Sequence, residues 1–230
     1  MSIAQRIAQV RANIAAAARE AGRAPQEITL VGASKMNDAS ACRAAVAAGI
    51  DALGENRVQE MTAKLAENAY DGAPLHFIGH LQRNKVRQVV GKADLIQSVG
   101  SLELLAEIEK AAGKLGILQN ILLEVNIGEE AAKSGFAPAE LLPGAEAALA
   151  MEHIRVLGLM TIPPAEADRE ENLRYFDSVR ALFLDIDGKL FHNSLTVLSM
   201  GMSGDYQDAI RAGATMVRVG TAIFGSRHYT

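Results

Sequence analysis

Tryptophan is absent from this 230-residue sequence, and aromatic residues of all kinds make up only 4% of it. Proteins that hold single-stranded nucleic acid stack its bases on aromatic side chains, so this shortage argues against such a platform. Long basic runs are also lacking, and the formal net charge is −4. Because nucleic acid is bound by clustered Lys and Arg, we expect no nucleic-acid partner.

Cysteine occurs once, at Cys42, so no disulfide can form within the chain. The Ala-rich helical pattern around it predicts a small core residue. Arg6 and Arg11 interrupt the apolar residues near the N-terminus, which argues against a signal peptide. No apolar run is long enough to span a bilayer. We therefore expect a cytoplasmic protein that does not associate with membranes.

Short apolar runs alternate with helix-like segments from residue 28 onward, after an amphipathic helix that ends near Gly22. The predicted strands are 28–33, 51–54, 75–79, 94–98, 120–126, 154–160, 195–199 and 215–219. The predicted helices between them are 38–48, 56–68, 81–90, 101–113, 138–150, 168–184 and 204–212. This alternation favours parallel strands joined by right-handed crossovers.

Eight such units in roughly 200–250 residues have the size of a (β/α)₈ TIM barrel, here with an extra N-terminal helix. A doubly wound open sheet is the alternative, but no G-x-G-x-x-G follows the first strand. No linker or change of composition divides the chain. The sequence therefore predicts an α/β protein with a single barrel domain over residues 1–230.

Lys35 ends the first predicted strand, where its amine would stand at the mouth of the core. Loss of water there disfavours the ammonium form, so such a lysine can attack a carbonyl and form a Schiff base. A rim lysine that keeps its charge in water is the alternative, and position alone favours it.

Glycines and hydroxyls follow the last two predicted strands, at Ser199 to Gly204 and at Gly220-Thr221. Loops at these places often bind phosphate in TIM barrels, because backbone N–H groups at a helix start attract anions. A simple turn with a helix cap is the alternative for each loop taken singly. Arg218 points away from its neighbours Val217 and Val219, which favours a ligand contact or a buried partner such as Glu55.

Other polar residues carry weaker signals. His76 and His80 lie on a strand-like run, where four residues span about 13 Å, so we expect no shared metal ion. Glu55 could be a general base, although a structural role holding Asn56 or Arg57 is the preferred interpretation. Lys133 lies in a segment that could act as a lid, with an ordinary surface loop as the default.

Five long motifs occur in order along the chain: GENRVQE at 54–60, HFIGHLQRNK at 76–85, GLMTIP at 158–163, LSMGMS at 198–203 and VRVGTAIFG at 217–225. Together they resemble the pyridoxal-phosphate homeostasis protein family, which is related to the barrel domain of alanine racemases. The resemblance covers nearly the whole chain. It implies an alanine racemase N-terminal-domain-like barrel that holds pyridoxal 5′-phosphate (PLP) as a Schiff base.

The resemblance also implies roles for residues at the predicted rim. Lys35 matches the Schiff-base lysine, and Asn56 matches a contact near the ring. Arg218 matches an arginine that faces the pyridine nitrogen, and Ser203 belongs to the phosphate cradle. The full predicted cofactor-binding set is Lys35, Asn56, His80, Ser199, Met200, Ser203, Arg218, Gly220 and Thr221.

The match of Arg218 has a chemical consequence. A guanidinium that donates to the ring nitrogen disfavours its protonation and weakens the cofactor as an electron sink. The related racemases also carry an extra β domain with a catalytic tyrosine, for which we expect no room in this chain. The resemblance therefore implies a monomer or weak dimer that serves PLP homeostasis and supplies apo-PLP enzymes, without a settled catalytic reaction.

Two alternative functions remain open on the sequence. The first is a PLP-dependent racemase or transaminase of low activity, with His80 or Tyr206 as the acid or base. The second is a Schiff-base aldolase acting on a phosphosugar, although in such aldolases the lysine usually ends a late strand.

The chain departs from the family pattern after Lys35, where Met36-Asn37-Asp38 stands in place of the more frequent Thr and Pro. Gly100 stands where Asp is common. These departures put fine specificity in question, and they leave the predicted Schiff-base and phosphate positions untouched.

Overall fold

The computed structural model describes residues 1–130 and 134–225, so Lys133 lies outside the described residues. The strands are β1 (Thr29–Ala33), β2 (Ala52–Glu55), β3 (Leu75–Phe77), β4 (Leu95–Val99), β5 (Gln119–Val125), β6 (Ile154–Thr161), β7 (Val197–Ser199) and β8 (Met216–Val219). Their hydrogen-bonded order follows the sequence and closes into a barrel. The predicted eight-stranded barrel is therefore confirmed.

The α-helices are α1 (Ile3–Glu20), α2 (Ala39–Ala47), α3 (Val58–Ala66), α4 (Leu102–Leu115), α5 (Leu141–Leu149), α6 (Arg169–Ile186), α7 (Tyr206–Arg211) and α8 (Thr221–Phe224). Helices α2 to α7 match predicted segments within a few residues at each end. The segment 81–90 is the exception, because only a 3-10 helix forms there, over Arg83–Gln88. The α-helix predicted over 81–90 was wrong, since Gln82 gives no side-chain cap and valines at three positions lower the helix propensity.

Contacts divide the chain into two compact units. Unit 1 consists of Met1–His76 and the chain from Met200 onward, and unit 2 consists of Phe77–Ser199. The prediction of one domain stays a prediction.

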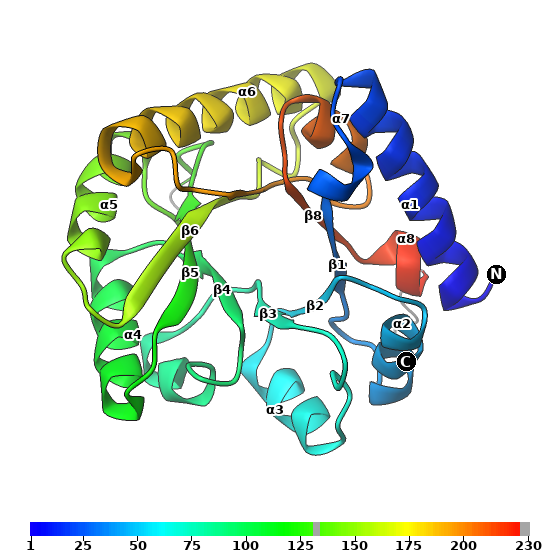
Figure 1. Cartoon of the computed structure of the whole chain (residues 1–230), viewed down its shortest axis with the longest axis horizontal. Coiled ribbons are helices and arrows are strands. Elements are labelled where there is room, and N and C mark those ends of the chain that lie inside the picture. The colour runs from blue at the N-terminus through cyan, green and yellow to red at the C-terminus, as the bar shows by residue number, and fades with distance from the viewer. Residues whose placement is uncertain (131–133, 226–230) are drawn as a thin grey trace. The chain divides into compact units, whose positions relative to one another are not determined.

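In unit 1, β1 pairs in parallel with β2 and with β8. Strand β1 is buried along nearly its whole length, as expected for a strand covered on both faces. Helix α1 begins with a capping box between Ser2 and Gln5, and its apolar face packs against α7, α8 and α2 (Figure 1). The N-terminal helix is therefore an integral layer of unit 1.

In unit 2, β5 pairs in parallel with β4 and with β6. Helices α4, α5 and α6 pack on these strands, as the green to yellow part of Figure 1 shows. Leu105 and Ile108 of α4 are fully buried and belong to the core of this unit.

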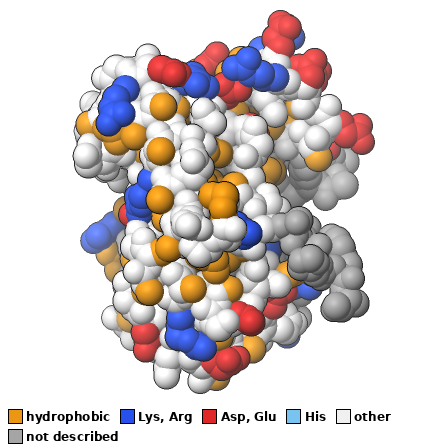
Figure 2. Space-filling view, turned by 90° about the vertical axis from the view of Figure 1, so that its right-hand side faces the viewer, with side chains coloured by type: hydrophobic (Ala, Val, Ile, Leu, Met, Phe, Trp, Pro, Cys, Tyr) orange, Lys and Arg blue, Asp and Glu red, His pale blue; other side chains and the backbone are white. Residues whose placement is uncertain are grey.

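No helix among the described residues is long and apolar enough to cross a membrane. On the face that Figure 2 shows, Lys and Arg side chains are interspersed with Asp and Glu, and apolar side chains form small separate areas.

Candidate functional site

Three neighbouring strands of unit 1 end beside one another. Ala33 of β1 pairs with Gly54 of β2, and Gly32 pairs with Val219 of β8. Lys35 lies two residues beyond its strand pair, as Asn56 does on β2, and Gly220 follows β8 directly. A Cβ atom on Gly220 would lie 3.3 Å from the Ala33 carbonyl oxygen, so the two chain segments approach closely. The pairing therefore brings three predicted site residues to the carboxyl ends of adjacent strands, where barrels bind ligands.

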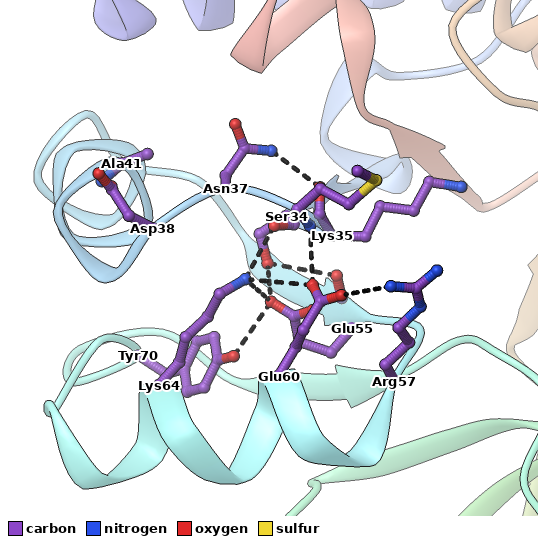
Figure 3. A network of polar contacts seen from close by, with 12 residues as sticks. Ser34, Lys35, Asn37, Asp38, Ala41, Glu55, Arg57, Glu60, Lys64 and Tyr70 are labelled. Atoms are coloured by element: carbon purple, nitrogen blue, oxygen red, sulfur yellow. Dashed lines mark hydrogen bonds and ion pairs between the residues drawn. The ribbon is translucent and has the colours of Figure 1, made fainter. Parts of the chain in front are cut away.

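Lys35 is half-buried and stands at the start of a sharp turn. Met36 adopts φ +61°, a left-handed conformation that non-glycine residues seldom take. Asn37 closes the turn, because its backbone N–H donates to the Ser34 carbonyl at 3.1 Å and its side-chain amide donates to the Lys35 carbonyl at 3.0 Å. In Figure 3 the Lys35 side chain extends away from the carboxylates beneath the turn.

A buried polar group, the Glu55 cluster, lies beneath this turn and consists of Ser34, Glu55, Lys64 and Tyr70 (Figure 3). One carboxylate oxygen of Glu55, Oε1, accepts from Ser34 Oγ at 2.6 Å, from Lys64 Nζ at 2.6 Å and from Tyr70 Oη at 3.1 Å. Lys64 also donates to the Ser34 carbonyl at 2.9 Å. Residues far apart in sequence thus converge on the strand end that carries Lys35.

The Glu55 cluster is shielded from water. Glu55 is 0% exposed and Lys64 is 6% exposed, so each charge depends on the other. Burial, and next the charge of Glu55, raises the pKa of the Tyr70 phenol far above its usual range, which keeps the phenol protonated as a donor. This geometry agrees with a structural role for Glu55. Its partners are Ser34, Lys64 and Tyr70 and not the expected Asn56 or Arg57. Arg57 pairs instead with Glu60 at 3.4 Å.

Sequence reasoning missed Lys64 and Tyr70. Lys64 reads as an ordinary surface lysine in an amphipathic pattern, four residues after Glu60. The sequence feature that could have indicated Lys64 is its position in α3, the helix that directly follows Glu55 at the end of β2. A buried carboxylate needs a partner, and α3 offers few cations.

The β8–α8 turn forms a second polar region, which we call the Ser203 region and which consists of Gly201, Ser203, Gly220 and Ala222. Ser203 Oγ accepts from the backbone N–H of Gly220 at 3.2 Å and from that of Ala222 at 3.4 Å. The loop after β7 is thus tied to the start of α8, next to the exposed Thr221. Backbone N–H groups and hydroxyls of this kind suit a phosphate.

Arg218 lies on β8 opposite Val31 and is 3% exposed. Its backbone N–H donates to the Gly201 carbonyl at 3.0 Å, which joins β8 to the Ser203 region. Burial raises the pKa of the nearby Asp205 carboxyl, and the positive charge of Arg218 opposes that rise. Arg218 is therefore a buried cation on β8, the strand that pairs with β1 on the side opposite to β2. Glu55, which the sequence offered as a possible partner for it, is paired with Lys64.

Met200 lies in unit 1 with its side chain fully buried, and its backbone N–H donates to the Met216 carbonyl at 3.1 Å. Two further predicted residues belong to unit 2. Ser199 is buried and its hydroxyl donates to Gln97 Oε1 at 2.7 Å. His80 is exposed and lines a hollow of about 380 Å³. The roles of all three in cofactor binding stay predictions.

Tyr206, the alternative acid or base, is 4% exposed, and its hydroxyl accepts from Asn13 of α1 at 3.0 Å. This contact ties it to the outer helix. Among the described residues, no group of three or more His, Cys, Asp or Glu side chains could hold a metal ion. A hollow of about 700 Å³ in unit 1 is lined by Arg11, Arg19 and the start of β1, at the end of the strand opposite to Lys35.

Comparison with known proteins gives consistent relatives. The family model for the alanine racemase N-terminal domain matches residues 6–228. The pyridoxal phosphate homeostasis protein of Aquifex aeolicus is 40% identical and covers all of both chains. That of Escherichia coli K12 is 41% identical over 99% of this chain and 98% of its own. The structure of PipY from Synechococcus elongatus with PLP bound is 34% identical, with a TM-score of 0.85 over 97% of this chain and 100% of that one.

Proposed function

Because the chain belongs to the alanine racemase N-terminal domain family, among the pyridoxal phosphate homeostasis proteins, we propose that it binds PLP through Lys35 and serves intracellular PLP homeostasis. The observation that carries this proposal is the meeting of Lys35, Asn56 and Gly220 at three adjacent strand ends of unit 1. An amine, an amide and a glycine turn in one place match the aldehyde, ring and phosphate of PLP.

The chain's own residues fit this cofactor. Asn56 Oδ1 is buried and has no hydrogen-bond partner, so an acceptor beside the Lys35 strand end awaits a donor. Ser203 and the exposed Thr221 offer hydroxyls beside backbone N–H groups, and Gly220 lacks a Cβ that would crowd Ala33. We assign Ser203, Gly220 and Thr221 to the phosphate, and Asn56 to the neighbourhood of the ring.

Lys35 supplies the covalent link. Its neutral amine attacks the aldehyde carbon, a C=N bond forms, and the aldehyde oxygen leaves as water with both amine protons. The amine stands apart from the Glu55 cluster, in which one carboxylate oxygen of Glu55, Oε1, accepts from Ser34, Lys64 and Tyr70. We therefore assign Glu55 to stabilising the strand end that carries Lys35.

Bound PLP supplies an electron sink for amino-acid chemistry, and the residues of this chain support that sink weakly. Arg218 is a buried cation, so a ring nitrogen facing it would stay unprotonated. Tyr206 is engaged by Asn13, and His80 is exposed. We therefore favour a carrier that supplies PLP to apo-enzymes in the cytoplasm over a racemase or transaminase.

The test is to add PLP to purified apo-protein, record the visible spectrum, reduce with borohydride and map the modified peptide. We expect a Schiff-base absorption band and a single modified residue, Lys35, with neither in Lys35→Ala. Lys110→Ala serves as a control because Lys110 is an exposed helix residue, with 59% of its side chain accessible. Scattered modification of surface lysines, or an unchanged band in Lys35→Ala, would reject the proposal.

A second measurement separates carrier from enzyme. The loaded protein is incubated with amino acids in deuterated water, and exchange at the α-carbon is followed by NMR. A carrier gives exchange no faster than free PLP. Sustained exchange that His80→Ala or Tyr206→Phe abolishes would instead favour the enzyme.

A further inference from the structure

The backbone on the C-terminal side of Lys35 is held by a carboxylate from another element. Glu60, in the first turn of α3, accepts from the Met36 N–H through Oε2 at 2.7 Å. Met36 is the left-handed residue of the turn. A residue other than glycine leaves this conformation readily unless its surroundings fix it. The charge-assisted bond from Glu60 holds the Met36 N–H itself, in addition to the two hydrogen bonds by which Asn37 closes the turn.

The backbone on the N-terminal side of Lys35 is held just as firmly. The Ser34 N–H donates to the Gly54 carbonyl at 2.9 Å, and the Ser34 carbonyl accepts from Lys64 at 2.9 Å. The Ser34 hydroxyl donates to Glu55 at 2.6 Å. Ser34 therefore has its N–H, carbonyl and side chain all engaged within the buried core.

We propose that Glu60 is a positioning residue for Lys35. It locks the left-handed Met36 while the Glu55–Lys64 pair locks Ser34, so the Lys35 stem leaves the backbone in one direction, away from the Glu55 cluster (Figure 3). This inference rests on the proposed binding of PLP through Lys35. Glu60 acts through the Met36 backbone and does not touch the cofactor. Its loss weakens only ligands that must reach the Lys35 amine.

Glu60 can be altered without leaving a buried charge unpaired. Its side chain is 23% exposed, and its ion-pair partner Arg57 is 68% exposed. Lys64 lies 4.0 Å from Glu60 but keeps its 2.6 Å contact with Glu55. Removing Glu60 should therefore spare the Glu55 cluster, in contrast to removing either member of the buried pair.

The experiment compares Glu60→Ala, Glu60→Gln and the control Gln59→Ala, which truncates an exposed side chain one residue earlier on α3. Each protein is titrated with PLP and with pyridoxine 5′-phosphate, which has the ring and phosphate but no aldehyde. We expect Glu60→Ala to weaken PLP binding about tenfold, as the loss of a charge-assisted hydrogen bond would, and to leave pyridoxine phosphate unchanged. Glu60→Gln keeps an acceptor for Met36 and should retain most of the PLP affinity, and Gln59→Ala should match the wild type.

Each other outcome overturns the inference. Equal weakening of both ligands by Glu60→Ala would mean general distortion of the site, and no weakening would mean that Met36 needs no anchor. Failure of Glu60→Gln to restore binding would mean that charge matters and the hydrogen bond does not. In these three cases a Lys35 adduct in the wild type would leave the proposed function standing. A wild type that forms no Lys35 adduct would overturn both.

Discussion

The Glu55 cluster and the Ser203 region stabilise neighbouring strand ends of unit 1 by opposite means. The cluster uses charged side chains without access to water, with Glu55 at 0% and Lys64 at 6% exposure. The Ser203 region uses backbone N–H groups, one hydroxyl and glycines. Both lie at the rim, but only the cluster has a charge that would be stranded by a single substitution.

This difference decides which substitutions each region tolerates. In the cluster, deletion of one partner leaves an uncompensated charge, which costs far more than the pair contributes. In the Ser203 region, deletion removes a modest hydrogen bond, whereas an added Cβ meets backbone. The strand end that carries Lys35 is fixed by ions, whereas the turn of the Ser203 region is fixed by hydrogen bonds of the backbone and has glycines where side chains would collide.

The largest effect should come from breaking the buried pair. Lys64→Met leaves the Glu55 carboxylate without its cation and should lower the free energy of unfolding by about 3–5 kcal/mol, measured by urea denaturation. Lys110→Met, which removes one partner of an exposed 4.0 Å ion pair, should change it by less than about 1 kcal/mol. The double variant Glu55→Leu/Lys64→Met should regain much of the loss, and a double variant no better than Lys64→Met would show that packing, not charge, sets the effect.

The Ser203 region should be destabilised by added side-chain atoms. Gly201 has φ +91°, and a Cβ there would lie 2.6 Å from the Ala209 Cβ and 2.9 Å from the Tyr206 Cα. Gly201→Ala should therefore cost about 2–4 kcal/mol, from backbone strain and overpacking together. Gly204→Ala, three residues along the same loop, meets nothing within 4 Å and should be nearly neutral in the same urea denaturation assay. Similar losses in both variants would refute the steric explanation.

Tyr70 gives the cluster a pH dependence that the Ser203 region lacks. Its folded pKa is raised by burial and by Glu55, so the unfolded chain releases this proton first as the pH rises. Stability from Tyr70 is fully present below about pH 10 and declines above it, by about 1 kcal/mol over the next pH unit. Tyr70→Phe should remove that part of the alkaline decline in urea denaturation at pH 9 to 11. The half-buried Tyr175→Phe is the control, and a decline of the same steepness in Tyr70→Phe and the wild type would contradict the prediction.

Sequence patterns predicted the barrel because its strands are short apolar runs separated by helices, and most of these runs are buried on both faces, as in β4. The pattern was misleading at 81–90, where spacing resembled an α-helix but the chain forms a 3-10 helix over Arg83–Gln88. Periodicity reports which residues face the core. It does not report whether a helix start is capped.

Some residues of the candidate site could be predicted from the sequence and others could not. Lys35 and Gly220 could be placed at one rim from strand ends alone, since parallel strands end on the same side. Lys64 and Tyr70 could not, because their partner Glu55 is defined by three-dimensional convergence and not by spacing. The role of a single polar residue can be assigned only when the structure shows whether it is buried and therefore needs a partner for its charge.

The smallest effect concerns the one strained residue of the Lys35 turn. The Ser203 region takes its positive φ at a glycine, Gly201, whereas the turn after Lys35 takes it at Met36, with φ +61°. Met36 is 49% exposed, so its side chain contributes little packing. Asn tolerates the left-handed region better than Met does. Met36→Asn should therefore raise the free energy of unfolding by about 0.5–1 kcal/mol in urea denaturation.

Met202→Asn is the matched control for this substitution, since Met202 is 40% exposed and has no positive φ. It should be neutral or slightly destabilising. If both variants gain stability, the gain comes from surface polarity, and if neither does, the bond from Met36 to Glu60 already removes the strain. Only a gain confined to Met36→Asn would mean that the backbone beside Lys35 is strained. Asparagine or glycine at position 36 would relieve that strain, whereas in the wild type the hydrogen bond to the Glu60 carboxylate keeps Met36 in the strained conformation.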